Sequence, residues 1–96
     1  DQAAKVKGMF IHPRQIADII KRHPEIQRAR MVVTREDGQD MMTLQCETPA
    51  SDAGITNAVT ETIQATCKLK GGVKLVAIGS LPNDGKVIDD QRETAG

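Results

Sequence analysis

The spacing of hydrophobic and polar positions changes along the chain, and each spacing predicts a different element. Residues 5–12 alternate between charged and apolar side chains and then become apolar, which is the pattern of a short strand. Gly8 interrupts this pattern and indicates a bulge, a simple bend, or a close approach by another backbone or a ligand. Pro13 suits the first position of a helix, which we expect to end before Pro24. The apolar stripe of that helix is Ile16, Ile19 and Ile20.

The middle of the chain has the strict alternation of a β-hairpin. Residues 28–35 and 41–47 alternate apolar and polar side chains, and the connector 36–40 between them is polar and contains a glycine. One face of this predicted strand pair is apolar and consists of Met31, Val33, Met42, Leu44 and Cys46. We therefore expect an antiparallel sheet that is covered on one side.

A second helix is predicted after the hairpin. Residues 49–52 have the composition of a helix start, with Ser51 or Asp52 as the N-cap. We expect this helix to run to about Leu69 and to stop at the glycines 71–72. Its apolar stripe is Ile55, Ala58, Val59, Ile63 and Cys67.

The order of these elements predicts the fold class. Residues 73–78 are rich in β-branched and aliphatic side chains and form the last predicted strand, and residues 93–96 are expected to be a frayed tail. The resulting order is strand, helix, strand, strand, helix, strand. We expect one domain over residues 1–96 with an α+β, ferredoxin-like split βαβ (βαββαβ) fold, in which two helices cover one face of an antiparallel sheet.

Composition narrows the classes of partner. The chain of 96 residues carries 13 basic and 13 acidic side chains, so its net charge of zero gives no general attraction to nucleic acid or to anionic membranes. Phe10 is the only aromatic residue, which leaves essentially no platform for stacking bases. The sequence has neither an apolar run of about 18 residues nor an apolar signal core. We expect a cytoplasmic protein with no nucleic-acid and no membrane partner.

The residues most often found in metal and redox sites do not form such a motif here. Cys46 and Cys67 each lie inside an apolar periodic segment, which favours reduced core cysteines over a disulfide or a functional thiol. His12 and His23 have no carboxylate or second histidine at metal-ligand spacing. We expect no metal site in this chain.

One lysine is the candidate for chemistry. Pro82 fixes a backbone angle and residues 83–85 tolerate tight or left-handed turns, so Lys86 is expected to leave the surface on a short, defined loop. A lysine ammonium is a compact charge with three donors, which suits a phosphate or a carboxylate. The alternative is a solvated surface lysine in a turn, because lysines are mostly exposed.

Three segments together resemble a known family. They are Lys-Val-Lys-Gly-Met-Phe-Ile-His-Pro at residues 5–13, Ala-Arg-Met-Val-Val-Thr-Arg at residues 29–35, and Leu-Pro-Asn-Asp-Gly-Lys-Val-Ile at residues 81–88. The chain resembles, over essentially its whole length, the small C-terminal domain of phenylacetate-coenzyme A ligases and related aryl-CoA ligases of the adenylate-forming superfamily. The resemblance implies a two-step ligase whose N-terminal domain binds ATP, with Mg²⁺, and a carboxylic acid. The acid becomes an acyl-adenylate with release of pyrophosphate, and coenzyme A then displaces AMP.

The resemblance also implies roles for individual residues. Such a small domain swings between two poses, and Lys86 matches the lysine of the adenylation step while Gly85 matches the glycine before it. Gly8 matches the glycine of the strand that lines the access path of the thiol, where the lack of a side chain lets the pantetheine arm pass. Asp1 falls where the family places its hinge. Residues 83–84 depart from the hydroxyl residues of commoner synthetases, which leaves the approach of the loop to phosphate open.

Two functional readings follow. In the first, the chain is the mobile C-terminal domain of an AMP-forming aryl- or acyl-CoA ligase, and it is inactive as an isolated domain. The alternative is a free-standing ferredoxin-like regulatory domain that binds a small molecule, in which Lys86 has no chemical role. The chain begins at Asp1 without a methionine, so we expect it to be part of a longer polypeptide.

Overall fold

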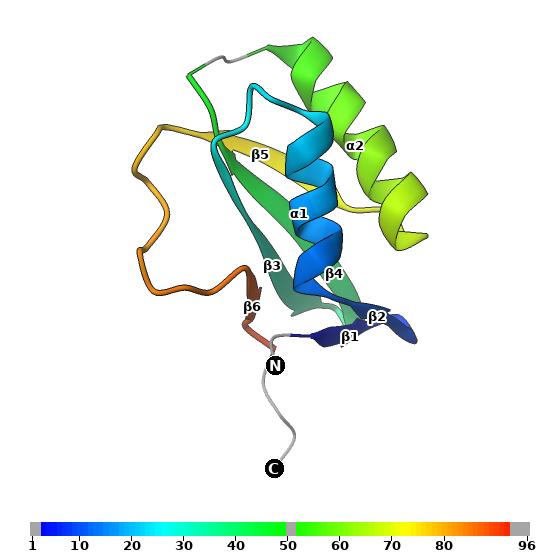
Figure 1. Ribbon diagram of the computed structural model, residues 1–96. Coiled ribbons are helices and arrows are strands. Elements are labelled where there is room, and N and C mark those ends of the chain that lie inside the picture. Colours follow the sequence, from blue (N-terminus) through cyan, green and yellow to red (C-terminus); the bar gives the residue numbers. More distant parts are fainter. Residues whose placement is uncertain (1–2, 50–51, 93–96) are drawn as a thin grey trace.

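A four-stranded sheet is the middle layer of the molecule (Figure 1). The computed structural model describes residues 3–49 and 52–92. In spatial order, the strands of this sheet are β5 (Gly72–Val76), β4 (Gln39–Glu47), β3 (Arg28–Glu36) and β6 (Ile88–Asp90). The long pair β3 and β4 is antiparallel, whereas β5 lies parallel to β4 and β6 lies parallel to β3.

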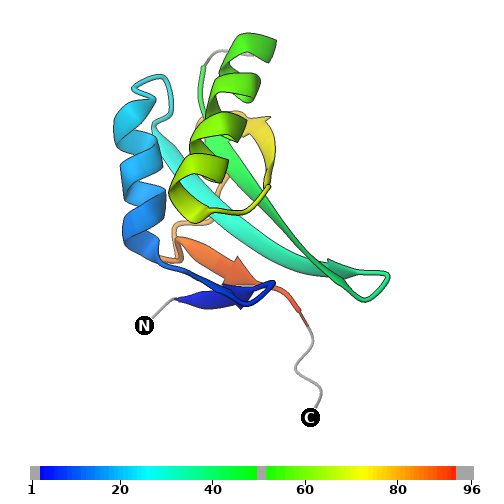
Figure 2. The same ribbon diagram turned by 90° about the vertical axis from the view of Figure 1, so that its right-hand side faces the viewer.

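Both helices pack on the same face of the sheet (Figures 1 and 2). The first, α1 (Pro13–Arg22), begins at the predicted proline and ends before Pro24. The second, α2 (Ala53–Cys67), is capped by the carboxylate of Asp52, which accepts a hydrogen bond of 2.7 Å from the Gly54 amide. It ends two residues earlier than predicted, because Lys68 takes the left-handed conformation at φ 63°.

The core lies between the helices and the apolar face of the hairpin. The register pairs Met31 with Leu44 and Val33 with Met42, so the predicted apolar face of β3 and β4 is confirmed. The expectation of a sheet covered on one side was wrong for β3, because Arg30 and Val32 on its other face are buried as well. Burial of each large aliphatic side chain contributes about 1.5–3 kcal/mol, which holds the two layers together. The helical residues that complete this core are Ile16, Ile19, Val59 and Ile63.

The α+β class with two helices on one face of a sheet is confirmed, but the strand pairing differs from the expected antiparallel sheet. The predicted first strand is a hairpin of β1 (Ala4–Val6) and β2 (Met9–Ile11), which forms a sheet of its own. The chain reverses there because Lys7 and Gly8 both have positive φ, 49° and 83°, as a tight two-residue turn requires. Strand β6, which the sequence did not predict, lies beside β3 and parallel to it. The pair β4 and β5 is parallel as well, so only the central pair of the sheet is antiparallel.

The cysteines follow the prediction. Cys46 and Cys67 are both free thiols in the core. Burial raises the pKa of the Cys46 thiol to about 11, because the thiolate loses hydration there. They are packing residues.

The segment 77–87 crosses the face of the sheet opposite the helices (Figure 1, orange). The last predicted strand was expected to run to residue 78, but β5 ends at Val76. Residues 77–87 then connect β5 to β6. Leu81 is the buried residue of the segment, at 6% exposure. We call residues 77–87 the lysine loop, because Lys86 lies near its end.

Neither helix of the described chain has the length and apolar character needed to cross a membrane. Within residues 3–49 and 52–92, no group of three or more His, Cys, Asp or Glu side chains is placed to hold a metal ion.

Candidate functional site

Lys86 is exposed, and its backbone is fixed on both sides. Its amide donates a hydrogen bond of 3.0 Å to the Asp84 carboxylate, and its carbonyl accepts one of 3.1 Å from Arg30 Nε. Gly85, between Asp84 and Lys86 in the sequence, has a φ of 76°, which residues with a side chain rarely adopt. The prediction that Lys86 lies on a loop with a defined backbone is confirmed, but the loop is the long connection 77–87 and not the short one expected. Within the described part of the chain, the Lys86 ammonium has no hydrogen bond or ion pair.

The buried side chain of Arg30 joins the lysine loop to β3. Besides the Lys86 carbonyl, its guanidinium donates to the Pro82 carbonyl at 3.2 Å and forms an ion pair with Asp84. The Arg30 side chain is only 6% exposed. A buried guanidinium is stable where acceptors of fixed geometry meet its donors, and this one meets three.

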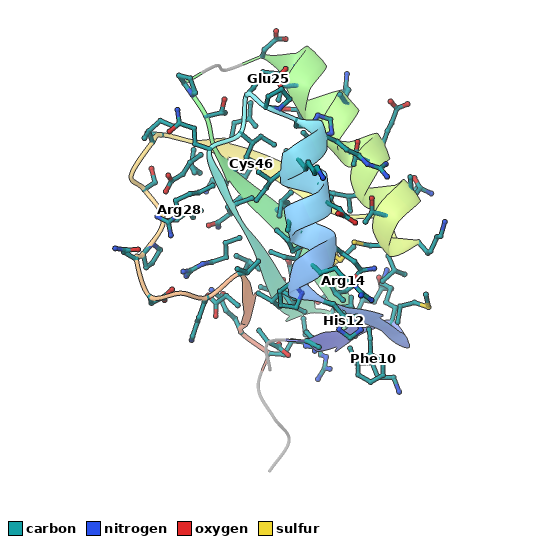
Figure 3. All side chains as sticks on the ribbon, viewed as in Figure 1. Phe10, His12, Arg14, Glu25, Arg28 and Cys46 are labelled. Atoms are coloured by element: carbon teal, nitrogen blue, oxygen red, sulfur yellow. The ribbon has the colours of Figure 1, made fainter. Side chains whose placement is uncertain are left out.

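A second pair of charges fastens the start of the loop. Arg28 donates to the carbonyls of Leu81 and Pro82 at 3.4 and 3.0 Å and lies 3.6 Å from Glu47. Glu47 is 2% exposed and accepts a hydrogen bond of 2.8 Å from the Leu81 amide. Figure 3 shows Arg28 on the loop side of the sheet.

The carboxylates that hold the loop are kept ionised by these contacts. The amides of Leu81 and Gly79, with Arg28, lower the pKa of Glu47 below its ordinary value. The Lys86 amide, with the guanidinium of Arg30, lowers the pKa of Asp84 in the same way. One oxygen of the Asp84 carboxylate is therefore held as an anion by Arg30 and the Lys86 amide, while the Lys86 side chain is exposed.

Gly8 occupies the turn between β1 and β2 instead of a bulge. A Cβ added there would have no described atom within 4 Å, so the close approach of another backbone is excluded for the described chain. The glycine is needed for its positive φ, and the turn is open. Gly8 lies in the β1–β2 hairpin and Lys86 in the lysine loop before β6, and no hydrogen bond or ion pair of the described residues joins the two. Asp1, the predicted hinge, lies outside the described residues.

Arg30, Arg28, Glu47 and Asp84 were missed as site residues by the sequence reasoning. The alternation of the predicted hairpin placed Arg30 on the polar face, which was correct. Nothing in the local pattern indicated that a loop from the far end of the chain would cover that face. The available signal was the pair Arg28 and Arg30, at alternate positions of one strand.

The family is decided by residues 8–92, which match the family described as AMP-binding enzyme C-terminal domain. The chain belongs to this family. The match includes both Gly8 and Lys86 and runs through nearly all of the described structure. A search of curated proteins returned no match.

Solved structures with the same fold include a ligase domain and much longer ligase chains. A domain of phenylacetate-coenzyme A ligase from Bacteroides vulgatus is 25% identical with a TM-score of 0.87, and the match covers 98% of this chain and 96% of that one. A 2-hydroxyisobutyryl-CoA ligase in complex with 2-HIB-AMP and CoA, in the thioesterification state, is 23% identical with a TM-score of 0.83. That match covers 97% of this chain and 22% of the ligase, so the chain spans about a fifth of the ligase's length.

A third likeness comes from fatty acyl-adenylate ligases of E. coli and L. pneumophila, at 24% identity and a TM-score of 0.72. It covers 90% of this chain and 16% of that one. At such identities these structures show the shared fold.

Proposed function

We propose that this AMP-binding enzyme C-terminal domain is the mobile domain of an AMP-forming aryl- or acyl-CoA ligase, and that Lys86 supplies the ammonium of the adenylation step. One observation carries the proposal. Lys86 is exposed on a loop that Arg30 and Asp84 fix immediately on both sides of it, while its ammonium is unpaired among the described residues. An exposed ammonium on a backbone of fixed conformation is suited to binding an anionic group on another domain.

The chemistry of the first step suits such a cation. A carboxylate oxygen of the acid attacks the α-phosphorus of ATP, and the bond from that phosphorus to the pyrophosphate oxygen breaks. The two reactants are anions that repel each other, and charge shifts during the attack. An ammonium placed between the carboxylate and the α-phosphate holds them together and stabilises the transition state. The binding pockets for ATP and the acid would belong to an N-terminal domain of the same polypeptide.

Mg²⁺ is not expected to bind to this domain. The described residues contain no cluster of three acidic or imidazole side chains that fits a cation. The metal that accompanies ATP would therefore be held by the N-terminal domain.

In the second step the thiol of coenzyme A attacks the acyl carbon and AMP leaves. We assign the turn at Gly8 to the path of the pantetheine arm. Gly8 has no side chain, and no described atom lies within 4 Å of the position that its Cβ would take. The turn and the lysine loop are separate elements of the domain, so each step would use different residues of it. Support for two poses comes from the 2-hydroxyisobutyryl-CoA ligase, whose structures represent a thioesterification state and a postadenylation state.

The test uses the full-length polypeptide that carries this chain. We expect ATP, coenzyme A and a panel of aryl and aliphatic carboxylic acids to yield AMP, pyrophosphate and an acyl-CoA, with release of AMP dependent on the acid. The chain of 96 residues alone is expected to yield none of them. Acid-independent release of AMP, or binding of a small metabolite by a dimer of the chain alone, would contradict the proposal.

A further inference from the structure

We infer that Arg30 is a positioning residue for Lys86, and that its pair with Asp84 sets the conformation in which the lysine loop presents the ammonium. This inference rests on the proposed role of Lys86. Arg30 and Asp84 are in contact although 54 positions separate them in the sequence.

The bonds of Arg30 are placed where they act on the lysine. Its three acceptors belong to Pro82, Asp84 and Lys86, so they bracket the turn that contains Gly85. The acceptor on Lys86 is its own carbonyl, one bond from the Cα atom that carries the side chain. A rigid, planar guanidinium with several donors can fix all three at once, which an ammonium cannot do with the same geometry.

Arg28 provides an internal comparison, because it contacts an earlier part of the same loop and shares only the Pro82 carbonyl with Arg30. Arg28 and Glu47 hold Leu81 and Pro82 at the beginning of the turn. Only Arg30 reaches Asp84 and Lys86. The attachment of the loop to the sheet therefore does not depend on Arg30 alone, whereas the orientation of its lysine end does.

Asp84 couples the arginine to the lysine a second time. The same oxygen, Oδ1, pairs with Arg30 and accepts the hydrogen bond from the Lys86 amide. These contacts give a structural role to Asp84, which stands where commoner synthetases have a hydroxyl residue. The carboxylate is used inward, to shape the turn, and is not directed toward a phosphate.

The experiment measures the two half-reactions separately in the full-length polypeptide, by single-turnover adenylate formation and by thioester formation from preformed acyl-adenylate. We expect Arg30→Met to slow adenylation about tenfold or more relative to thioester formation, since a misplaced catalytic group costs up to about 100-fold. Arg30→Lys is expected to fall between Arg30→Met and the parent enzyme. Hydrogen exchange of peptides from the lysine loop should accelerate in Arg30→Met.

Two further variants keep the test independent of folding. Asp84→Ala removes a side chain that is 41% exposed, so the core remains intact and the turn loses its carboxylate. Its adenylation defect should not add to that of Arg30→Met in the double variant. Val33→Ala, a change on the helix-facing side of β3, the strand that carries Arg30, is the control for stability and should slow both half-reactions to the same extent.

The outcomes separate the two proposals. If Lys86→Ala leaves adenylation unchanged, the proposed function fails. If Lys86→Ala slows adenylation while Arg30→Met and Asp84→Ala change both half-reactions equally, as Val33→Ala does, only the positioning role of Arg30 is overturned. Unchanged hydrogen exchange of the lysine loop in Arg30→Met would overturn it as well.

Discussion

The guanidinium of Arg92 lies 3.0 Å from the carboxylate of Asp40 and joins the end of β6 to the beginning of β4. Arg92 also donates a hydrogen bond of 2.7 Å to the Lys5 carbonyl. The Asp40 carboxylate accepts two more hydrogen bonds, from the Lys7 amide at 3.1 Å and from Arg35 at 3.2 Å. The turn that contains Gly8 is thereby fixed to the strand that follows the lysine loop. If the domain swings between two poses, these contacts make both proposed faces move as one body.

Asp40→Asn tests this junction. The variant keeps the shape of the side chain but removes the charge that three donors share, so we expect a lower melting temperature and faster hydrogen exchange around Lys7. Asp18→Asn on the exposed surface of α1 is the control, and its effect should stay within about 0.5 kcal/mol. Equal melting temperatures for the two variants would contradict the role of Asp40.

The ion pairs predict a loss of stability in acid. Four carboxyl groups have a pKa below the ordinary value, because amide and guanidinium donors favour their ionised forms: Asp40, Glu47, Asp84 and Asp90. A carboxyl whose pKa is lower in the folded than in the unfolded state stabilises the fold fully above its ordinary pKa of about 4, and this stabilisation is lost as the pH falls through the folded value.

Urea unfolding of the chain should therefore give a falling free energy of unfolding as the pH decreases from about 5 to 3. Glu47→Gln removes one of the four carboxyls and should flatten part of this dependence. A free energy of unfolding that stays constant or rises over this interval would show that these contacts do not stabilise the fold.

Gly8 has a matched control inside the same molecule. Asp37 and Gly38 form the tip of the β3–β4 hairpin with φ 52° and 77°, close to the 49° and 83° of Lys7 and Gly8. Asparagine tolerates such angles better than other side chains, so Gly8→Asn and Gly38→Asn should cost similar stability. Neither introduced side chain meets a described atom at its Cβ.

In the proposed ligase, only Gly8→Asn should then slow the formation of thioester from preformed acyl-adenylate. Single-turnover measurements with both variants compare them directly. Equal rates in the two variants would remove Gly8 from the path of the thiol.

The sequence predicted best those features that depend on a long local pattern. The stripe of α1 and the alternation of β3 and β4 repeat over enough residues for the spacing to identify them. The turn at Gly8 was not recognised because Lys-Gly is not among the common hairpin dipeptides. Strand β6 has three residues, too few for any period.

The site was predictable only in part, for the same reason. Pro82 and Gly85 revealed locally that Lys86 would lie on a defined loop. The role of Arg30 depends on a contact across 54 positions, and it arises when the lysine loop folds over the polar face of the sheet. Such a tertiary contact leaves no periodic trace in the sequence.

The central claim is that the exposed ammonium of Lys86 activates the acid. Its most direct test is the rate of acyl-adenylate formation in a single turnover of the full-length Lys86→Ala enzyme, compared with its rate of thioester formation from preformed acyl-adenylate. We expect adenylation to fall by about 100-fold or more, the cost of losing one preorganised electrostatic contact, while thioester formation stays near the parent rate. Lys21→Ala, at an exposed position of α1, should change neither rate. Equal losses in both half-reactions, or an unchanged rate of adenylation, would contradict the account.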